Sequence, residues 1–488
     1  MDAKFVFNQL FWFYLSYFLI VIAYYFIFGI IGLIEAGRRM HEDQIEDYES
    51  LNHSHFTLPV SILVPAHNEE SCIRNTLLSI LGLNYRNYEV IVIDDDSTDK
   101  TFDVLQGMLD LEAEDIPYRD HFKSGTIKGL YRSKRYEHIR VIRKFSRGHK
   151  AGALNAGLNL AKHRYVCVID SDTLLEPNAL LQVMTHAEKA PERVIGVSSF
   201  FGISNGFTVQ DGKVIKRRWR ANLLGDFQQL EYIRSFIGTR IGWSRLNSLP
   251  ILSGAFAVWE KRFLLHIGGF SGQYSSEDME ITFHAQKDSR RGGKAKYEIL
   301  FLPYVAGWTL GPETIKSLMT QRNRWQRVAT EAMAHYAPMF LNPRYGTFGM
   351  VTLPYFLFYE VLGAVIEISS VIVTTLGFLT GLMNVGQYAS FLLFLVLFQS
   401  LTTMIPLWVF NYRQKLFDTG GLLYMITLSF FEMLTYRWIT TAARVQGLYD
   451  FCRGNHAFTR MERPAQNSRG NSDHTSPLKD EETEAAVR

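Results

Sequence analysis

A run of 30 residues without a charged side chain, from Phe5 to Ile34, constrains this chain more than any other feature. A helix of about 20 apolar residues crosses the hydrocarbon core of a bilayer, so the run is long enough to span one. It is too long for a signal-peptide core, has no small-residue cleavage site, and is followed by Arg38 and Arg39. We therefore expect an uncleaved transmembrane helix over residues 5–36, with its C-terminal end in the cytosol.

A second apolar region lies near the other end of the chain. Residues 368–412 are free of charge and contain a turn-like segment at 383–387, which leaves room for two spans. Residues 345–359 combine Pro354 with many aromatics and suit a helix that lies along the headgroups. The stretch 421–443 has two readings, a full span or a partly embedded helix. Only the second keeps the arginines that follow it inside, as the positive-inside tendency prefers.

Glu360 and Glu367 precede the second uncharged run and fall in the first part of its first helix. An unpaired carboxylate is costly inside a membrane, so both side chains need partners or water. Two roles are open to Glu367, lining a polar path or forming a satisfied ion pair near the interface, and we expect the pair.

The chain between the apolar regions has the composition of a globular domain. All 488 residues together are 47% hydrophobic and 20% charged, which excludes a disordered protein, and the net charge of +3 gives no reason to expect a nucleic-acid partner. Three scattered cysteines indicate neither a disulfide framework nor a zinc site and suit a reducing cytosol. We expect a cytosolic domain at 40–344, an interfacial helix plus two or three membrane helices at 345–446, and a basic interfacial segment with a disordered polar tail at 447–488.

Short apolar runs alternate with helical stretches in the first part of the cytosolic domain. Residues 60–65, 88–93 and 165–169 read as strands, and helices are expected at 71–82 and 152–161. This alternation predicts an α/β domain with parallel strands. Ligands of such sheets gather at the carboxyl ends of the strands, so the polar residues that follow each run are candidate binding residues.

Acidic and amide side chains follow three of these strands: Asn68 and Glu69, Asp94 and Asp95, and Asp170 and Asp172. Two carboxylates this close supply the hard oxygen ligands that Mg²⁺ or Mn²⁺ prefers, with the remaining ligands taken from phosphates. Short acidic turns also occur without a metal. Carboxylates gathered at one sheet edge, however, repel one another unless a cation or hydrogen-bond donors compensate. A metal-bound nucleotide would supply both.

Lys150 stands at the start of an expected helix, directly after Gly148 and His149. A helix N-terminus with a glycine and a lysine could cradle a phosphate. Residues 119–150 as a whole carry 11 Lys or Arg against two acids, a local balance of +9. A solvated loop that faces acidic lipid headgroups is at least as good a reading for most of these cations.

Two further motifs lie later in the domain. Glu277 and Asp278 open an amphipathic stretch, where a carboxylate could act as a general base or could favour a helix N-terminus. Gln321, Arg324 and Trp325 lie on a helix that leads toward the membrane. They could hydrogen-bond, pair with a diphosphate and stack on a sugar, or they could form a basic juxtamembrane face.

Taken in order, these motifs resemble those of the membrane-embedded family 2 glycosyltransferases, such as cellulose synthase, hyaluronan synthase and the synthases of poly-N-acetylglucosamine and chitin oligosaccharides. Seven motifs across most of the chain carry the resemblance: residues 64–69, 94–99, 148–150, 170–172, 253–256 and 277–278, and Gln321-x-x-Arg324-Trp325. The resemblance implies a cytosolic α/β domain of the GT-A (nucleotide-diphospho-sugar transferase) fold, flanked by transmembrane helices in the plasma (inner) membrane. It also implies a hexosyltransferase whose donor is a UDP-sugar, with N-acetylglucosamine or glucose as the sugar.

The resemblance further implies roles for single residues. Donor binding falls to Asn68, Glu69, Asp94, Asp95, Lys150 and Asp170, with Lys150 at the diphosphate. Mg²⁺ or Mn²⁺ would be held by Asp170 and Asp172, with Asp172 as the direct ligand. Asp278, beside Glu277, would deprotonate the acceptor hydroxyl, so that an α-linked donor gives a β-linked product. The catalytic group would be completed by Arg324 at the departing diphosphate and by Trp325 and Gln321 near the acceptor and nucleotide.

Two positions depart from the family pattern. Ser276 stands where Thr or Gly is frequent, and Val328 stands where a small Gly often follows the tryptophan, so Val328 could narrow the acceptor path. We expect a processive synthase that extends a β-linked polysaccharide and exports it, with the membrane, a nucleotide sugar and the glycan as its partners. The alternatives are transfer of one sugar to a lipid-linked acceptor and a non-catalytic subunit of an export complex. Because the membrane segments are few, a homo-oligomer or an export partner could complete the path.

Overall fold

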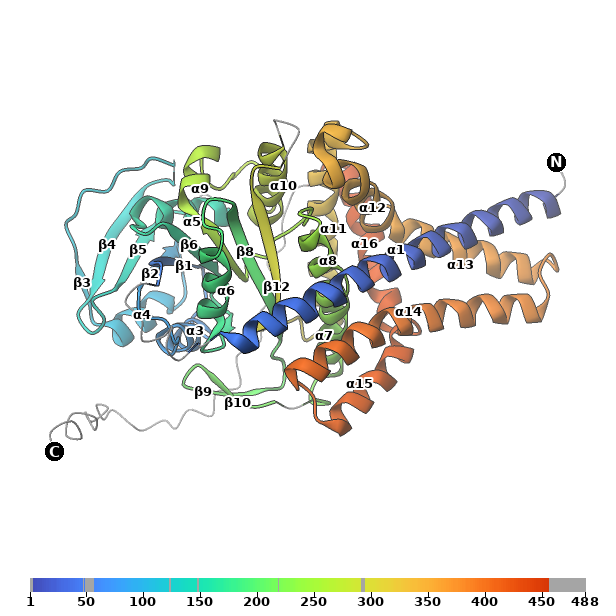
Figure 1. The fold of residues 1–488 in the computed structure, drawn as a ribbon, viewed down its shortest axis with the longest axis horizontal. Helices are drawn as coiled ribbons and strands as arrows, with labels where there is room; N and C mark the ends of the chain where they lie inside the picture. Colours follow the sequence, from blue (N-terminus) through green and yellow to red (C-terminus); the bar gives the residue numbers. More distant parts are fainter. Residues whose placement is uncertain are drawn as a thin grey trace.

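The computed structural model describes residues 3–46, 48, 57–122, 124–146, 149–217, 219–290 and 295–455. Its core is a mixed sheet in the order β3-β4-β5-β2-β1-β6-β11-β8-β12-β7, with a separate β9-β10 hairpin (Figure 1). The strands are β1 (Val60–Ala66), β2 (Tyr88–Asp95), β3 (Leu111–Ala113), β4 (Ile127–Ser133), β5 (Ile139–Lys144), β6 (Tyr165–Ile169), β7 (Leu174–Leu175), β8 (Val194–Ile203), β9 (Thr208–Gln210), β10 (Lys213–Lys216), β11 (Phe256–Glu260) and β12 (Glu298–Thr309). The polar tail expected at the end of the chain lies outside the described residues.

Strands β5, β2, β1 and β6 are neighbours and run parallel, as the alternating sequence pattern predicts. Both β1 and β6 are buried along their whole length, which is why they read as continuous apolar runs. β11 lies antiparallel between β6 and β8, and β4 lies antiparallel beside β5. The sheet is therefore mixed rather than purely parallel, but the carboxyl ends of β1, β2 and β6 still share one edge.

Helices cover both faces of the sheet (Figure 1). Successive residues of β1 alternate between two hydrophobic clusters, with Leu63 in one and Ile62 and Val64 in the other. The helices of this part are α3 (Ile73–Leu81), α4 (Thr101–Leu109), α5 (Lys150–Leu160), α6 (Ala179–Glu188), α7 (Leu223–Ser235), the π-helical turn η1 (Phe236–Arg240), α8 (Ile241–Arg245), α9 (Lys261–Ile267), α10 (Glu277–Ser289) and α11 (Ile315–His335). The helices α3 and α5 correspond to those expected at 71–82 and 152–161.

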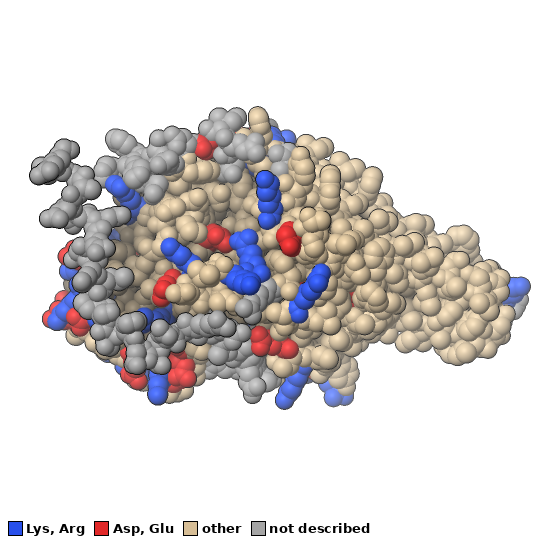
Figure 2. Space-filling view, turned by 90° about the horizontal axis from the view of Figure 1, so that it is seen from below, with Lys and Arg blue, Asp and Glu red and all other residues tan. Residues whose placement is uncertain are grey.

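The remaining helices form an elongated apolar extension. They are α1 (Ala3–Ile45), the helical turns η2 (Ala337–Met339), η3 (Pro343–Tyr345), η4 (Phe348–Thr352), α12 (Leu353–Tyr355) and η5 (Phe356–Val361), and the helices α13 (Gly363–Leu379), α14 (Val385–Gln414), α15 (Thr419–Glu432) and α16 (Tyr436–Cys452). Figure 1 shows α1, α13 and α14 running together away from the sheet. On the face seen in Figure 2, this narrow end carries charge only at its tip, whereas charged side chains gather on the broad part.

Two of the described helices, Ala3–Glu42 and Val385–Tyr412, are long and apolar enough to cross a membrane. A third span results if Phe348–Val361 and Gly363–Leu379, which meet at a bend of 50°, are counted as one. The stretch 421–443 is not one continuous helix, because α15 ends at Glu432 and α16 begins at Tyr436. At 14 residues, α15 is about 21 Å long and too short to cross a core of about 30 Å.

Carboxylates within the helical extension are paired with arginines from α16. Glu367 is 8% exposed and receives a hydrogen bond of 3.0 Å from Nε of Arg437, which confirms the ion pair expected for it. Glu360 pairs with Arg444 at 3.3 Å. These pairs hold α16 against α13 and against η5, which precedes α13.

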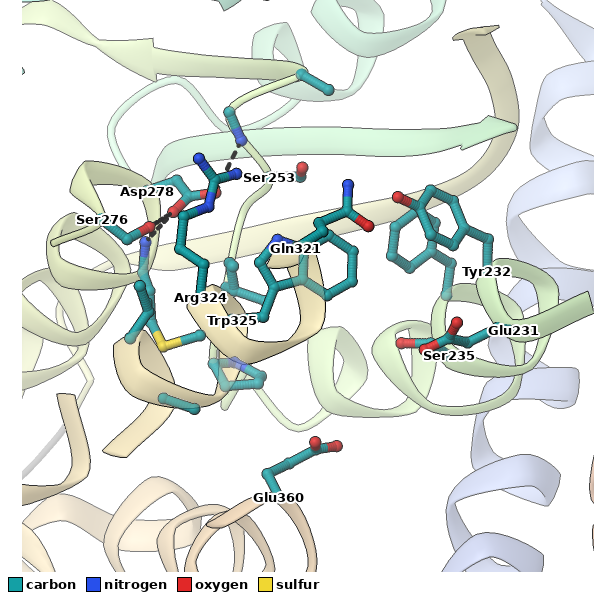
Figure 3. A pocket seen from close by; sticks show the side chains of 18 of the residues that line it. Glu231, Tyr232, Ser235, Ser253, Ser276, Asp278, Gln321, Arg324, Trp325 and Glu360 are labelled. Atoms are coloured by element: carbon teal, nitrogen blue, oxygen red, sulfur yellow. Dashed lines mark hydrogen bonds between the residues drawn. The ribbon is translucent and has the colours of Figure 1, made fainter. Parts of the chain in front are cut away.

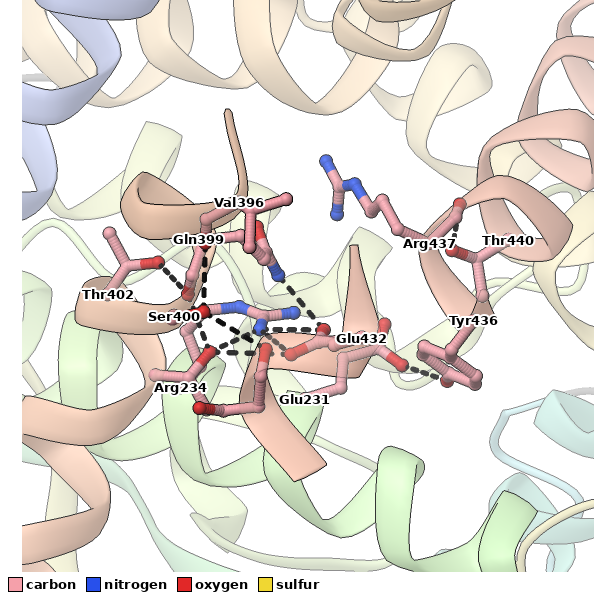
Figure 4. Close-up of polar contacts among 12 residues, drawn as sticks. Glu231, Arg234, Val396, Gln399, Ser400, Thr402, Glu432, Tyr436, Arg437 and Thr440 are labelled. Carbon is pink, nitrogen blue, oxygen red and sulfur yellow. Dashed lines mark hydrogen bonds and ion pairs between the residues drawn. The ribbon is translucent and has the colours of Figure 1, made fainter. Parts of the chain in front are cut away.

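A second buried network ties the globular part to the extension (Figure 4). Arg234 of α7 pairs with Glu432 of α15 at 2.7 Å, and Gln399 and Thr403 of α14 complete the hydrogen bonding around the pair. The Arg234 and Glu432 side chains are 6% and 0% exposed. The network therefore holds α7, α14 and α15 together through an ion pair that is almost fully buried.

Candidate functional site

A cavity of about 600 Å³ opens where the sheet edge meets α10, α11 and the helical extension. Eight of the twelve residues to which the sequence analysis assigns donor binding, metal binding or catalysis line it: Lys150, Asp170, Asp172, Glu277, Asp278, Gln321, Arg324 and Trp325. Figure 3 shows Asp278 at the start of α10, Arg324 and Trp325 on α11, and Tyr232 on α7, all around the same space. Residues that are more than 150 positions apart in the chain therefore form one site.

Asp278 is oriented by uncharged hydrogen-bond donors. Its Oδ1 accepts hydrogen bonds from the Ser276 hydroxyl and from the backbone N–H of Met279 at 2.8 Å, and its Oδ2 accepts one from the backbone N–H of Gly254 at 3.1 Å. Asp278 stands in the first turn of α10, where the helix dipole also favours a negative charge. Among the described residues, Asp278 forms no ion pair. Ser276, a departure from the family pattern, thus contacts the expected base directly.

Lys150 bridges two carboxylates at the first turn of α5. Its Nζ lies 2.5 Å from Oδ1 of Asp170 and 2.9 Å from Oε1 of Glu277. Burial lowers the pKa of Lys150, but the two carboxylates outweigh it and raise the pKa above its ordinary value. A Cβ on Gly254 would come within 2.8 Å of Nζ, so the glycine leaves room for this convergence. The ammonium is charged and stands beside the expected base.

Asp170 and Asp172 fit the metal expected between them and a diphosphate. Both line the cavity, and Oδ1 of Asp172 lies 3.4 Å from the hydroxyl of Thr309. Within the described ranges, no group of three or more His, Cys, Asp or Glu side chains could form a complete metal cage. Mg²⁺ and Mn²⁺ accept one or two carboxylates when phosphates supply further oxygens. The donor set therefore suits a cation that is completed by the ligand itself.

Helix α11 presents Gln321, Arg324 and Trp325 to the cavity, and the buried Arg322 beside them contacts other residues of the cavity wall. Arg322 pairs with Glu231 at 2.6 Å and donates to the Tyr436 hydroxyl at 3.1 Å. Its guanidinium also lies 4.0 Å from the centre of the Trp325 ring. Trp325 stays 38% exposed, with the ring of Tyr232 at 6.5 Å. This exposed aromatic face is suited to stacking on a sugar.

Val328, one turn beyond Trp325, also lines the cavity. The position that is often glycine in similar sequences therefore faces the space in which an acceptor would lie.

Four residues predicted to bind the donor lie at the ends of β1 and β2. They are not among the described residues that line this cavity: Asn68, Glu69, Asp94 and Asp95. Asn68 has a left-handed backbone with φ of 56° and accepts a hydrogen bond of 2.6 Å from the backbone N–H of Thr98. It thereby joins the end of β1 to the loop after β2. Their role in donor binding stays a prediction.

Asp94 and Asp95 are neutralised by cations of the basic stretch. Arg143 donates to Asp94 at 3.0 Å, and the fully buried Lys144 donates to Asp95 at 2.6 Å. In the register of β2 against β5, Asp94 lies beside Arg143 and Asp95 beside Lys144. Some of the positive charges in residues 119–150 therefore neutralise acids at the sheet edge and do not face lipid headgroups. The sequence does contain a signal for this pairing, because two acids in a row end β2 and two bases in a row end β5.

The cavity extends beyond the predicted residues toward the helical extension. Its further lining includes Tyr25 of α1, Arg240 of η1, Tyr359 and Glu360 of η5, and Arg437 and Arg444 of α16. These residues sit in apolar or aromatic surroundings without a recognisable motif, so the sequence alone does not reveal them.

Comparison with known proteins agrees with this arrangement. The chain matches the model of "Glycosyl transferase family 2" over residues 61–245 and that of "Glycosyl transferase family group 2" over residues 165–439. It is 26% identical over 275 residues to the poly-β-1,6-N-acetyl-D-glucosamine synthase of Staphylococcus epidermidis, and 25% identical over 275 residues to that of Staphylococcus aureus strain COL. Each match covers 56% of this chain and 55% of the relative, so the chain matches about half the length of these curated relatives.

One solved structure is similar over most of the chain. The mannosyltransferase PcManGT from Pyrobaculum calidifontis, in complex with GDP-Man and Mn²⁺, matches 86% of this chain and 99% of its own. The TM-score is 0.51 and the sequence identity 16%. This likeness confirms that the mixed α/β sheet has the GT-A-like fold expected from the motifs.

Proposed function

Because the chain belongs to glycosyltransferase family 2, we propose that it transfers sugar from a UDP-sugar to a growing β-linked polysaccharide with inversion at the anomeric carbon. We propose N-acetylglucosamine or glucose as the sugar, and processive synthesis coupled to export as the mode of action. The observation that supports this best is the single cavity that contains both Asp278 and the Gln321, Arg324 and Trp325 side chains and extends to residues of α1 and α16.

The donor is proposed to lie along the carboxyl edge of the sheet. Asn68, Glu69, Asp94 and Asp95 stand on the nucleoside side of this edge, and Lys150 stands where the diphosphate enters the cavity. Asp170 and Asp172 would hold a divalent cation, which would supply further positive charge to the departing diphosphate. Lys150 is then free to exchange its contact with Asp170 for a phosphate oxygen, because both are acceptors for the same ammonium.

Transfer itself is assigned to Asp278. One carboxylate oxygen takes the proton of an acceptor hydroxyl, and the hydroxyl oxygen forms a bond to the anomeric carbon as the bond to the diphosphate breaks. Lys150 and Arg324 stabilise the negative charge that the leaving diphosphate gains, a contribution that is large in such reactions. Attack from the face opposite the leaving group converts an α-linked donor into a β-linked product.

The acceptor is proposed to stack on Trp325 and to continue toward Tyr25 and Tyr359. This course leads from the base to the helical extension, which we propose to be embedded in the plasma (inner) membrane with the sheet domain in the cytosol. The positive charges of Arg38 and Arg39 after the first span support that orientation.

Transfer of one sugar to a lipid acceptor is the second candidate. Two or three candidate spans among the described helices are few for a self-contained export path, and Val328 occupies space in the acceptor cavity. A homo-oligomer or an export partner would complete the path in the processive reading. A non-catalytic subunit is disfavoured, because Asp170, Asp172 and Asp278 are all present and converge on one cavity.

Turnover by the full chain in nanodiscs tests the proposal. The protein is incubated with Mg²⁺ or Mn²⁺ and a panel of nucleotide sugars, and both the released nucleoside diphosphate and the size of the product are measured. A long glycan from one UDP-sugar supports the processive synthase. A single sugar on an added lipid supports the second candidate, and folded protein that consumes no donor would contradict both.

A further inference from the structure

Arg240 lines the cavity without an acidic partner among the described residues. It stands at the end of η1 and lines the cavity, yet its Nη1 is buried and has no hydrogen-bond partner in the described parts of the chain. Its guanidinium lies 3.9 Å from the centre of the Phe236 ring. The ring covers one face of the guanidinium. The N–H groups lie in the plane of the guanidinium, so this stacking does not use them as hydrogen-bond donors.

Three other arginines that line the same cavity are neutralised by acids. Each has a carboxylate within ion-pair distance: Arg234 has Glu432, Arg437 has Glu367, and Arg444 has Glu360. The nearest acids that act on Arg240, Asp278 and Glu360, do so only through their charge and without a direct contact. Burial lowers the pKa of Arg240 to about 10, and it stays charged at neutral pH. One uncompensated positive charge therefore faces the cavity.

Such a charge is costly to bury unless a ligand compensates it. Placement in a π-helical turn agrees with a functional role, because insertions of this kind occur frequently at functional sites. Arg240 lines the same cavity as Asp278 and Glu360, and η1, at whose end it stands, packs against α1 and α14 of the helical extension. This is the side of the cavity assigned above to the acceptor.

The lining of this part of the cavity suits a sugar better than a lipid tail. It is aromatic, with Trp325 and Tyr232 near the base and Tyr25, Tyr355 and Tyr359 further along. Aromatic faces stack on sugar rings, and tyrosine hydroxyls can bond to sugar hydroxyls. An isoprenoid chain would instead meet polar groups that it cannot satisfy.

We propose that Arg240 binds an anionic group on the acceptor, and that the acceptor is therefore a glycan that carries acidic groups in addition to the glucose or N-acetylglucosamine units proposed above. The group is a carboxylate or a phosphate on a sugar unit that lies along the cavity from the reacting hydroxyl. A guanidinium binds either anion through two parallel N–H···O bonds. This inference rests on the proposed transfer function, since it names the class of acceptor for that same site.

Direct binding tests the inference independently of turnover. The full chain in nanodiscs is titrated with an oligoglucuronate hexasaccharide and with the same hexasaccharide after reduction of its carboxyl groups to alcohols. Farnesyl phosphate serves as the lipid-phosphate probe and a phosphorylated oligosaccharide as the sugar-phosphate probe. We expect either acidic oligosaccharide to bind about tenfold or more tightly than its neutral counterpart, as one charge-assisted contact allows.

Variants of two arginines identify the residue responsible. We expect Arg240→Gln to abolish the preference for the acidic oligosaccharide and Arg240→Lys to restore part of it, which a loss of folding alone would not produce. Arg245→Gln is the matched control, because Arg245 lies five positions further on and its side chain is 61% exposed.

Three results would overturn the inference. They are equal affinity for acidic and neutral oligosaccharides, a preference that survives in Arg240→Gln, and Arg240-dependent binding of farnesyl phosphate with no binding of either acidic glycan. The last result would assign the cavity to a lipid phosphate. Release of nucleoside diphosphate, measured on the same preparation, reports separately on the proposed transfer function.

Discussion

Two sets of charged residues in and beside the candidate cavity are arranged in opposite ways: Asp278 and Arg240 form one set, and Arg234 and Glu432, where α7 meets the helical extension, form the other. In the cavity, Asp278 is held by a hydroxyl and two backbone N–H groups, and Arg240 has no acidic partner in the described structure. Where α7 meets the extension, Arg234 and Glu432 neutralise each other, and side-chain amide and hydroxyl groups complete the hydrogen bonding around the pair.

The difference separates two uses of buried charge. A charge that is oriented by uncharged donors can still gain or lose a proton or bind a ligand, whereas a fully paired charge is already satisfied. Both kinds of buried charge occur side by side in the wall of the cavity, because Arg234 and Arg240 belong to adjoining turns of α7 and η1. Substitution in the first group should affect turnover and binding, and substitution in the second should affect stability.

The largest effect is expected for Asp278→Asn. Asparagine keeps the size and the acceptor oxygen but cannot take a proton, so we expect kcat to fall by about 10²–10⁴-fold. Nucleoside diphosphate release by the purified protein measures this. Asp288→Asn is the control on the same helix, because Asp288 lies outside the cavity and faces His266. Equal loss in both variants would show that α10, and not the base, is responsible.

Breaking the buried pair should affect stability strongly. Glu432→Gln leaves Arg234 without its carboxylate, and we expect a loss of about 3–5 kcal/mol in the free energy of unfolding. Thermal unfolding in detergent measures the direction and rank of the effect. The double variant Arg234→Met with Glu432→Leu removes both charges and should regain much of the loss. A double variant as unstable as the single one would mean that the pair contributes more than mutual neutralisation.

A neutral histidine gives the protein an acid-sensitive stability. His186 is 3% exposed, and burial, together with the charge of Arg39, lowers its pKa to about 3. The unfolded chain takes up a proton below about pH 6.5, and the folded protein does not. The contribution of His186 to the free energy of unfolding is therefore complete above pH 6.5. It falls by roughly 1.4 kcal/mol per pH unit as the pH drops from 6.5 toward 3. The midpoint of thermal unfolding should change less between pH 7.5 and pH 5.5 in His186→Gln than in the unaltered chain.

The smallest effect is expected for an exposed ion pair. Arg193 and Glu298 contact each other at 2.5 Å, but their side chains are 66% and 33% exposed. We expect Arg193→Gln to change stability by less than about 1 kcal/mol, because water screens the pair. A loss as large as that of Glu432→Gln would contradict the view that burial, and not pairing as such, separates the two regions.

Much of the cavity could be predicted because its residues belong to strand and helix ends. Asp170 and Asp172 follow a buried strand, and Lys150 and Asp278 begin helices, so local pattern alone placed them at edges where ligands gather. The pairing of Glu367 was also predictable, since an unpaired carboxylate at that depth is costly. Its partner Arg437 was not, because the choice depends on how α13 and α16 pack.

Other features depend on contacts between distant segments. Lys144 lies in a stretch that reads as a basic loop, but the register of β2 and β5 puts it beside Asp95. The break between α15 and α16 falls inside an apolar run without Pro or Gly, where local propensity gives no reason to stop. Arg240 is one arginine among many, and only the packing of η1 leaves it facing the cavity without an acid.

The sequence by itself determined the candidate spanning segments, the α/β order and many of the residues that line the cavity, because hydrophobic period and strand-end position are local properties of the chain. Only the tertiary structure decided which charges are paired and which remain open to a ligand. Whether a buried charge is satisfied depends on side chains that approach from other elements, as Glu432 does for Arg234 and no acid among the described residues does for Arg240.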